Sequence, residues 1–362
     1  MKVTVSQENL KKATALTEKV VSKNTSLPIL NNILLKTENG RLKLSATNLE
    51  IGINTIIGVK IEEMGEIAVP ARILSDFISH ITDDKIILTT KNNTLFVNSE
   101  NYKTQILGFD PKDFPIIPKI KNEPVASIPA KLLRNTLITV LDSVAVSETR
   151  PELAGVYIQV KNNQAILAST DSFRLTETKM LFKNSEAFST ILPRNTVTEL
   201  IRVAGDTTGD IQIRYADNQI AFSNDDFEMI SRVVDGNYPD YKRVIPDKFL
   251  SRALVKKHDL EKNIRLAGLF ASNIADIKIQ CGEQHMKIAA KNSDKGEIET
   301  TVPVLLRNDP FEVSLNYKYF LDGLKNINTE DVIIEFTGVG SPLVIKPSED
   351  DSMVYIIMPL RN

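Results

Sequence analysis

The chain has 362 residues, of which 42% are hydrophobic and 25% charged, a composition typical of a soluble globular protein and unlike that of a disordered chain. Its 44 basic and 46 acidic residues give a net charge of −2, so overall charge does not point to a nucleic-acid-binding protein. A single core is improbable at this length, which predicts two or three domains.

The first ten residues, MKVTVSQENL, contain one lysine and alternate apolar with polar side chains. A signal peptide has a continuous apolar centre, which this pattern lacks. An apolar run of about 18 residues, as in a membrane-spanning helix, does not occur either. We therefore expect a cytoplasmic protein without a membrane partner.

The first part of the chain predicts a helix, a hairpin and a second helix, in that order. Leu10 and Ala13 lie on one face of the first predicted helix, and Lys12 lies on the opposite face. Asn39-Gly40, between two alternating runs, is a strong signal for a tight hairpin. The stretch PARILSDF at 70–77 then predicts the second helix.

The same elements recur twice along the chain. Hairpin signals return at 162–163 and 281–282, and second helices are expected near 193–200 and 316–322. In the three second helices Leu74, Val197 and Phe320 are each 123 residues apart. A period near 120 residues is too long for a solenoid repeat, so it predicts three whole domains of one fold. We place them at 1–122, 123–249 and 250–362.

Each copy predicts an α+β domain in which helices pack on antiparallel sheets. The first helices of all three copies place lysine or arginine opposite the apolar face, at Lys12, Lys131, Arg134, Lys262 and Arg265. A solvated helix surface explains any one of these faces. If the three faces line one space, they instead concentrate positive charge on a wall suited to a phosphate backbone, with contacts that are independent of base sequence.

Side chains for metal, nucleotide or nucleophilic chemistry are few. The three histidines His80, His258 and His285 lie in separate parts of the chain, without paired ligands at zinc spacing. Neither a Gly-x-x-x-x-Gly-Lys loop nor a complete dinucleotide fingerprint is present. Cys281, expected in a turn, has no histidine partner in the pattern. We expect no cofactor, no metal and no catalytic residue.

A catalytic interpretation has one further candidate. Asp76, Glu199 and Asp322 recur at the same place in the three copies, but equivalent acids in three domains lie far apart, so a role on the helix surface fits them better than acid–base pairing. A hydrolase with an interdomain site and a scaffold that binds proteins but not DNA remain as alternatives.

Five short strings in this order resemble the bacterial replicative sliding clamp family, the β subunit of DNA polymerase III. They are LPIL at 27–30, VPAR at 69–72, TDSFRL at 170–175, VDGNYPDY at 234–241 and YIIMPLR at 355–361. The resemblance implies a non-enzymatic processivity factor. It implies a head-to-tail homodimer whose six domains close a ring around double-stranded DNA, with helices lining the hole.

The resemblance also implies partners and the residues that meet them. The replicative polymerase, the clamp loader and repair proteins would dock peptides of the Gln-Leu-x-Leu-Phe type between the second and third domains. The implied pocket comprises Leu153, Thr170, Arg174, Leu175, Pro239, Arg243, Val244, Asn316, Tyr319, Met358, Pro359, Leu360 and Arg361. Its leucine, valine and methionine would accept the apolar side chains of the peptide, and arginine and asparagine would satisfy its backbone and glutamine.

Two further sets follow from the resemblance. The DNA-facing set is Lys12, Lys23, Asn24, Arg72, Lys131, Arg134 and Arg194, with Asn24 where an arginine is frequent. Ile106 and Leu269 are the expected contacts between subunits. Ser172 and Phe173 replace a frequent Gly-His pair, and Asn362 replaces a frequent leucine, which predicts a somewhat different peptide preference.

Overall fold

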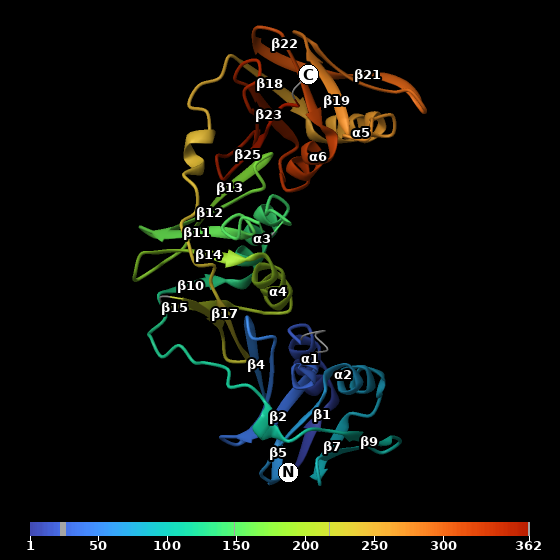
Figure 1. The fold of residues 1–362 in the computed structure, drawn as a ribbon, viewed down its shortest axis with the longest axis vertical. Helices are drawn as coiled ribbons and strands as arrows, with labels where there is room; N and C mark the ends of the chain where they lie inside the picture. Colours follow the sequence, from blue (N-terminus) through green and yellow to red (C-terminus); the bar gives the residue numbers. More distant parts are fainter. Residues whose placement is uncertain (22–26, 148, 217, 361–362) are drawn as a thin grey trace. The chain divides into compact units, whose positions relative to one another are not determined.

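The computed structural model describes residues 1–21, 27–147, 149–216 and 218–360. The described residues form two helices in each sequence copy, as predicted (Figure 1). These helices are α1 (Gln7–Glu18), α2 (Ala71–His80), α3 (Ala130–Leu141), α4 (Arg194–Gly205), α5 (Lys257–Gly268) and α6 (Tyr317–Lys325). Short 3-10 helices η1 (Pro28–Asn31), η2 (Pro111–Asp113) and η3 (Tyr241–Val244) lie in the connections.

The chain divides into two compact units, one of residues 1–131 and 198–233 and one of residues 132–197 and 234–362. The first unit contains two antiparallel sheets. One has the strand order β5 (Lys60–Glu63), β1 (Lys2–Ser6), β7 (Lys85–Lys91), β8 (Thr94–Asn98), β9 (Lys103–Leu107). The other has the order β10 (Ala126–Pro129), β15 (Asp210–Ala216), β16 (Gln219–Ser223), β17 (Phe227–Arg232), β4 (Ile51–Gly58), β3 (Arg41–Thr47), β2 (Asn32–Glu38), β6 (Glu66–Pro70).

The second unit contains one antiparallel sheet of twelve strands. The first part of its order is β14 (Phe188–Pro193), β11 (Gly155–Lys161), β12 (Gln164–Thr170), β13 (Arg174–Leu181), β25 (Met353–Ile357), β24 (Leu343–Pro347). It continues with β23 (Asp331–Phe336), β18 (Ser251–Lys256), β21 (Gly296–Asn308), β20 (His285–Asn292), β19 (Asp276–Cys281), β22 (Phe311–Asn316). Strand β13 of the second copy pairs with β25 of the third, which joins the two copies in one sheet.

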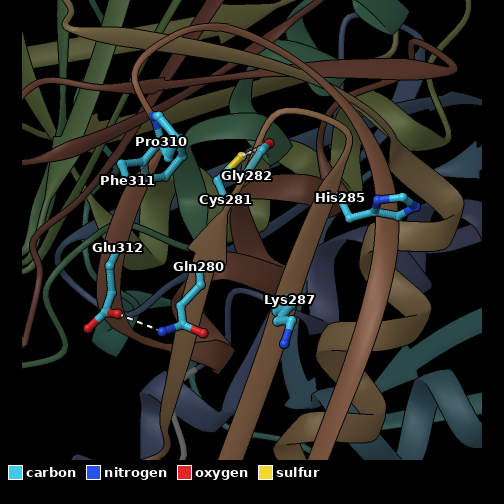
Figure 2. A pocket seen from close by; sticks show the side chains of 8 residues that line it. All are labelled: Gln280, Cys281, Gly282, His285, Lys287, Pro310, Phe311 and Glu312. Atoms are coloured by element: carbon cyan, nitrogen blue, oxygen red, sulfur yellow. Dashed lines mark hydrogen bonds between the residues drawn. The ribbon is translucent and has the colours of Figure 1, made fainter.

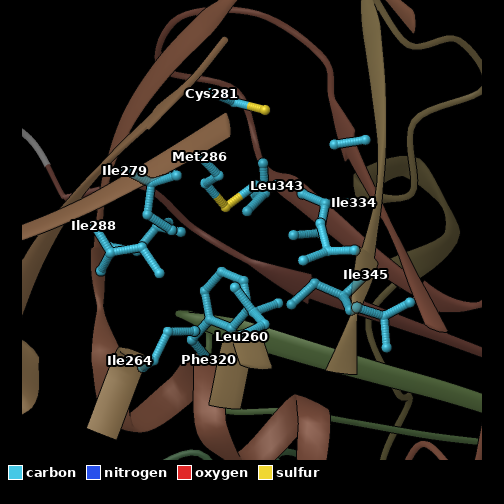
Figure 3. Packing of buried hydrophobic residues seen from close by; sticks show 14 of the residues in the cluster. Leu260, Ile264, Ile279, Cys281, Met286, Ile288, Phe320, Ile334, Leu343 and Ile345 are labelled. Carbon is cyan, nitrogen blue, oxygen red and sulfur yellow. The ribbon is translucent and has the colours of Figure 1, made fainter. Parts of the chain in front are cut away.

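The predicted apolar faces of the helices are the buried ones. In α1, Leu10, Ala13 and Thr17 are buried, and the Ser6 hydroxyl caps the first turn by accepting from the Asn9 amide at 3.4 Å. Figure 3 shows Phe320 of α6 and Leu260 of α5 packed against strand side chains of the third copy. Burying a side chain the size of phenylalanine contributes about 2–3 kcal/mol, so this packing is a main source of stability for that copy.

Two of the three predicted hairpin turns have the expected backbone. Asn39 and Gly40 have φ of 51° and 75°, and Asn162 and Asn163 have 52° and 60°, so both pairs form tight turns with two left-handed residues. The prediction for the third copy was wrong in its position. Cys281 is the buried last residue of β19 and not part of the turn. The connection consists of residues 282–284, and β20 begins at His285.

None of the described helices is both long and apolar enough to cross a bilayer.

Candidate functional site

The candidate peptide-binding surface is centred on the turn between β12 and β13. We name this surface the Phe173 groove. The Thr170 hydroxyl donates to the Arg174 carbonyl at 2.6 Å and accepts from the Ser172 amide at 3.1 Å. The Asp171 carboxylate accepts from the amides of Phe173 and Arg174, each at 3.0 Å. Ser172 has a left-handed φ of 77°. These bonds fix a turn that leaves the Phe173 side chain 60% exposed at its tip.

Arg174 is locked at the base of this turn. Its Nε donates to Asp171 at 2.9 Å, its Nη1 donates to Asp322 of α6, and its guanidinium lies 4.5 Å from the centre of the Tyr319 ring. Burial alone would lower the pKa of Arg174, but the neighbouring Tyr355 and the carboxylates of Asp322 and Asp171 hold that pKa above its usual value. The guanidinium therefore joins β13 to α6.

Three tyrosines form a cluster next to the groove. The rings of Tyr157 and Tyr238 stack with centroids 5.2 Å apart, and Tyr241 meets both edge-on. The Tyr241 hydroxyl donates to the buried Glu177 carboxylate at 2.7 Å. Burial, together with Glu177, raises the pKa of Tyr241. The tyrosines pack with the buried Leu175 and so support the part of β13 that follows the turn.

The last described residues continue the same surface. The Met358 amide donates to the Phe173 carbonyl at 2.8 Å, and the Leu360 amide donates to the Ser314 carbonyl at 2.9 Å. Met358, Pro359 and Leu360 are half-buried, so each presents part of its apolar surface to solvent. This arrangement places the C-terminal segment against the Phe173 turn on one side and β22 on the other.

Asn316 has a structural role that the sequence did not predict. Its side-chain oxygen caps α6 by accepting from the amides of Lys318 at 3.0 Å and Tyr319 at 3.4 Å, and its amide group donates to the Ile274 carbonyl at 3.2 Å. Arg174 is likewise held by carboxylates, so both side chains have a structural role in the described chain. The sequence pattern could not distinguish a capping asparagine from a ligand-binding one.

The other expected groove residues lie in the same compact unit. Leu153 is buried, Pro239 is half-buried and Val244 is exposed. Arg243 is exposed and pairs with Asp240, with Nε and Oδ2 2.7 Å apart. Arg361 lies outside the described residues.

The expected DNA-facing residues differ in how far they are available. Lys12, Arg72 and Lys131 are exposed, although Lys12 pairs with Glu8 at 2.7 Å. Arg134 is half-buried. The Arg194 guanidinium donates to the carbonyls of Leu141 at 3.2 Å and Val144 at 3.0 Å, and so caps the end of α3. Lys23 and Asn24 lie outside the described residues.

One of the two expected subunit contacts was wrong. Ile106 is only 4% exposed because its side chain points into the core of the first copy. Adjacent side chains of a strand point to opposite faces, so Leu107, 73% exposed, is the residue that faces outward. Leu269, which follows α5, is exposed and stays a predicted contact.

The repeated acids pair with arginines rather than with each other. Asp76 lies 3.6 Å from Arg72, and Glu199 lies 2.8 Å from Arg202. The third acid, Asp322, is the partner of Arg174 described above. This supports the helix-surface role that the sequence favoured.

A separate hollow of about 460 Å³ lies at the end of the β19–β20 hairpin (Figure 2). Cys281 and Phe311 line it, and Gln280 donates to Glu312 at 2.7 Å at its edge. Burial raises the pKa of the Cys281 thiol to about 12, so the thiol stays protonated at neutral pH. A protonated, buried thiol is a poor nucleophile, and the arrangement gives no support to a catalytic site.

Three family models together match nearly the whole chain. They describe the N-terminal, central and C-terminal domains of the DNA polymerase III beta subunit and match residues 1–118, 127–240 and 242–361. The chain belongs to this family. Its resemblance to the bacterial replicative sliding clamps is therefore confirmed, as is the α+β fold in three clamp domains.

Individual sliding clamps agree with this assignment over their full length. The beta sliding clamps of Staphylococcus epidermidis and Staphylococcus aureus are each 29% identical over 359 residues, 96% of this chain and 95% of theirs. The crystal structure of the beta subunit from Thermotoga maritima is 28% identical, with a TM-score of 0.95 over 100% of this chain and 99% of that one. A Pseudomonas aeruginosa sliding clamp bound to griselimycin is 26% identical, with a TM-score of 0.94 over 100% of both chains.

The function of the chain is that of a sliding clamp in DNA replication, a processivity factor and not an enzyme. Neither the hydrolase nor the protein-only scaffold is favoured by these relatives.

Proposed function

We propose that two copies of the chain close head to tail around duplex DNA and hold the replicative polymerase, the clamp loader and repair proteins through short peptides. The domains within the ring would be those expected from the sequence, at 1–122, 123–249 and 250–362. Since the partners act on the chromosome, we place this activity in the cytoplasm. Holding is topological in this proposal, so a net charge of −2 is no obstacle.

The observation that carries the peptide-binding part is the groove of the second unit. Phe173 is exposed at the tip of a hydrogen-bonded turn, and the half-buried Met358 lies beside it because its amide donates to the Phe173 carbonyl. Val244 and Leu360 present further apolar surface in the same unit. Fixed apolar side chains suit anchors such as the leucine and phenylalanine of a Gln-Leu-x-Leu-Phe peptide, because little entropy is lost on binding. One solved clamp is bound to griselimycin, so a protein of this fold can hold a ligand.

A peptide titration tests the groove. A fluorescent Gln-Leu-Asp-Leu-Phe peptide should bind the wild-type protein, and Phe173→Asp should weaken binding at least ~10-fold, which corresponds to about 1.4 kcal/mol. Leu181→Asp is the matched control because Leu181 is also exposed and ends the same strand, β13. Equal affinities for the wild type and Phe173→Asp would contradict the assignment.

For DNA, we propose contacts from Lys12, Arg72 and Lys131, which are exposed. Arg134 and Arg194 remain in the proposed set, but we expect each to contribute less to DNA binding. Arg134 is half-buried, and Arg194 caps α3. Each lysine or arginine that meets a phosphate should contribute about one unit to the salt dependence of DNA affinity.

Two free strand edges support the closing of the ring between copies. Among the described strands, β9 pairs only with β8, and residues 296–303 of β21 pair only with β20. An unpaired edge favours addition of another strand. Leu107 lies at the end of β9, and Leu269 lies next to Phe270, which approaches Gly296 of β21.

We propose that these two edges pair between subunits. Leu269→Asp should then shift the protein from dimer to monomer in analytical ultracentrifugation.

A further inference from the structure

A turn in the first unit repeats the side-chain to backbone hydrogen bonds of the Thr170 turn. It joins β3 to β4 and lies 123 residues before the Thr170 turn. The Thr47 hydroxyl donates to the Ile51 carbonyl at 2.9 Å and accepts from the Leu49 amide at 3.0 Å. The Asn48 side chain accepts from the amides of Glu50 at 3.0 Å and Ile51 at 2.8 Å. Leu49 has a φ of 76°, against 77° for Ser172.

The neighbouring strand also has its counterpart. Strand β4 pairs with β17, as β13 pairs with β25. The Arg232 amide donates to the Glu50 carbonyl at 3.0 Å, which is the bond that the Met358 amide makes with Phe173 in the other groove. The first unit therefore holds the same backbone frame, with Glu50 in place of Phe173 and Arg232 in place of Met358.

This second frame surrounds an open hollow of about 230 Å³. Its floor is apolar, since Ile51 and Ile230 are buried. Leu49 and Ile116 line the hollow and are 50% and 94% exposed. Ile117 packs so closely on the backbone that a Cβ at Gly52 would come within 2.7 Å of its Cγ2 atom. The connection between the first two copies thus forms one wall of the hollow.

The charged groups at the front define what the hollow can accept. Arg232 lines it and is exposed, and within the described chain its guanidinium makes no ion pair and no hydrogen bond. Glu50, in the turn before β4, lies beside Arg232 because its carbonyl accepts from the Arg232 amide, and Glu50 is also exposed. An exposed, unpaired guanidinium next to aliphatic side chains suits one carboxylate, and the nearby Glu50 disfavours a run of acids.

We infer that this hollow is a second docking site, which takes an extended peptide of a partner protein carrying one aliphatic and one acidic side chain. The inference rests on the proposed function, because it extends the peptide-binding role of the Phe173 groove to a groove of the same frame. We expect the second site to be about 10-fold weaker, since the charged side chains of Glu50 and Arg232 replace the apolar Phe173 and Met358 at its edge.

Isoleucine methyl NMR on the full-length dimer reads the two sites separately. Ile116, Ile117 and Ile230 report on the second site, and Ile356, which packs with Leu175, reports on the Phe173 groove. Titration with Gln-Leu-Asp-Leu-Phe should shift the Ile356 methyl first and then, saturably, the other three. Absence of shifts at Ile116, Ile117 and Ile230 at 100 times the dissociation constant measured at Ile356 overturns the second site and leaves the first intact. Absence of a shift at Ile356 overturns the first groove.

Substitutions separate docking from nonspecific shifts. Ile116→Asp should abolish the second-site shifts and leave the Ile356 titration unchanged, because Ile116 is almost wholly exposed and contributes little to folding. Arg232→Glu should weaken the second site at least 5-fold, and a peptide with lysine in place of aspartate should restore binding to that variant. Ile73→Asp on α2 is the matched control, also exposed in the first unit. Equal effects of Ile73→Asp and Ile116→Asp, or no effect of Arg232→Glu, would contradict the inference.

Discussion

The Thr47 and Thr170 turns share their hydrogen bonds but differ in what surrounds them. In both, a threonine hydroxyl and an asparagine or aspartate side chain satisfy the same backbone groups. Around Thr170, a guanidinium is buried between two carboxylates and tyrosines form the support. Around Thr47, aliphatic side chains form the support and the guanidinium stays free. A few polar side chains therefore preserve the backbone of the repeated turn, while the side chains packed around it determine which ligands it could bind.

The largest effect is expected at the locked arginine. Arg174→Ala leaves Asp171 and Asp322 without their common partner, and breaking a mostly buried ion pair costs about 3 kcal/mol. Calorimetry should show a lower melting temperature for the variant, by roughly 5–10 °C. Arg243→Ala is the control, since its pair with Asp240 is exposed and should change stability by less than about 1 kcal/mol.

A smaller loss is expected in the tyrosine cluster. Tyr241→Phe removes the hydroxyl that donates to the buried Glu177 carboxylate, which should cost about 2 kcal/mol. Ile117→Val, in the aliphatic support of the other turn, removes one methyl group and should cost about 1 kcal/mol. Urea unfolding of both variants measures the difference. Equal losses would mean that the Tyr241 hydrogen bond contributes little to the support of its groove.

The two threonines should behave alike. Thr47→Ala and Thr170→Ala each remove a hydroxyl that donates to one backbone group and accepts from another, at a cost of about 1–2 kcal/mol. Hydrogen exchange at the amides of Leu49 and Ser172 should accelerate to a similar extent in the two variants. Acceleration at one turn alone would show that the shared hydrogen bonds do not carry equal weight.

The smallest change is expected at the free arginine. Arg232→Ala removes no ion pair and no side-chain hydrogen bond within the described chain, so the unfolding free energy of the variant should stay within about 0.5 kcal/mol of the wild type. Thermal unfolding is sufficient to check this. A loss comparable to that of Arg174→Ala would contradict the distinction between a locked and a free guanidinium.

The sequence predicted the repeat, the helices and their buried faces because each depends on local periodicity. Leu10, Leu133 and Leu260 are all buried as that periodicity requires. The sequence-based prediction failed at Ile106, because a shift of one residue along a strand changes the face that a side chain occupies. It also missed that Asn316 caps α6 and that Glu177 meets Tyr241, since both depend on contacts between distant or competing groups. The sequence shows Tyr238 and Tyr241 in one short motif, but it could not predict that both pack with Tyr157.

The central claim is that the protein holds DNA by encircling it. The most direct measurement loads the protein onto nicked circular DNA with a cognate clamp loader and ATP, then follows retention by gel filtration in high salt before and after the DNA is linearised. An encircling clamp should be retained on circles and lost from cut ends, whereas electrostatic binding alone would not distinguish the two DNAs. Equal retention on circular and linear DNA would contradict it.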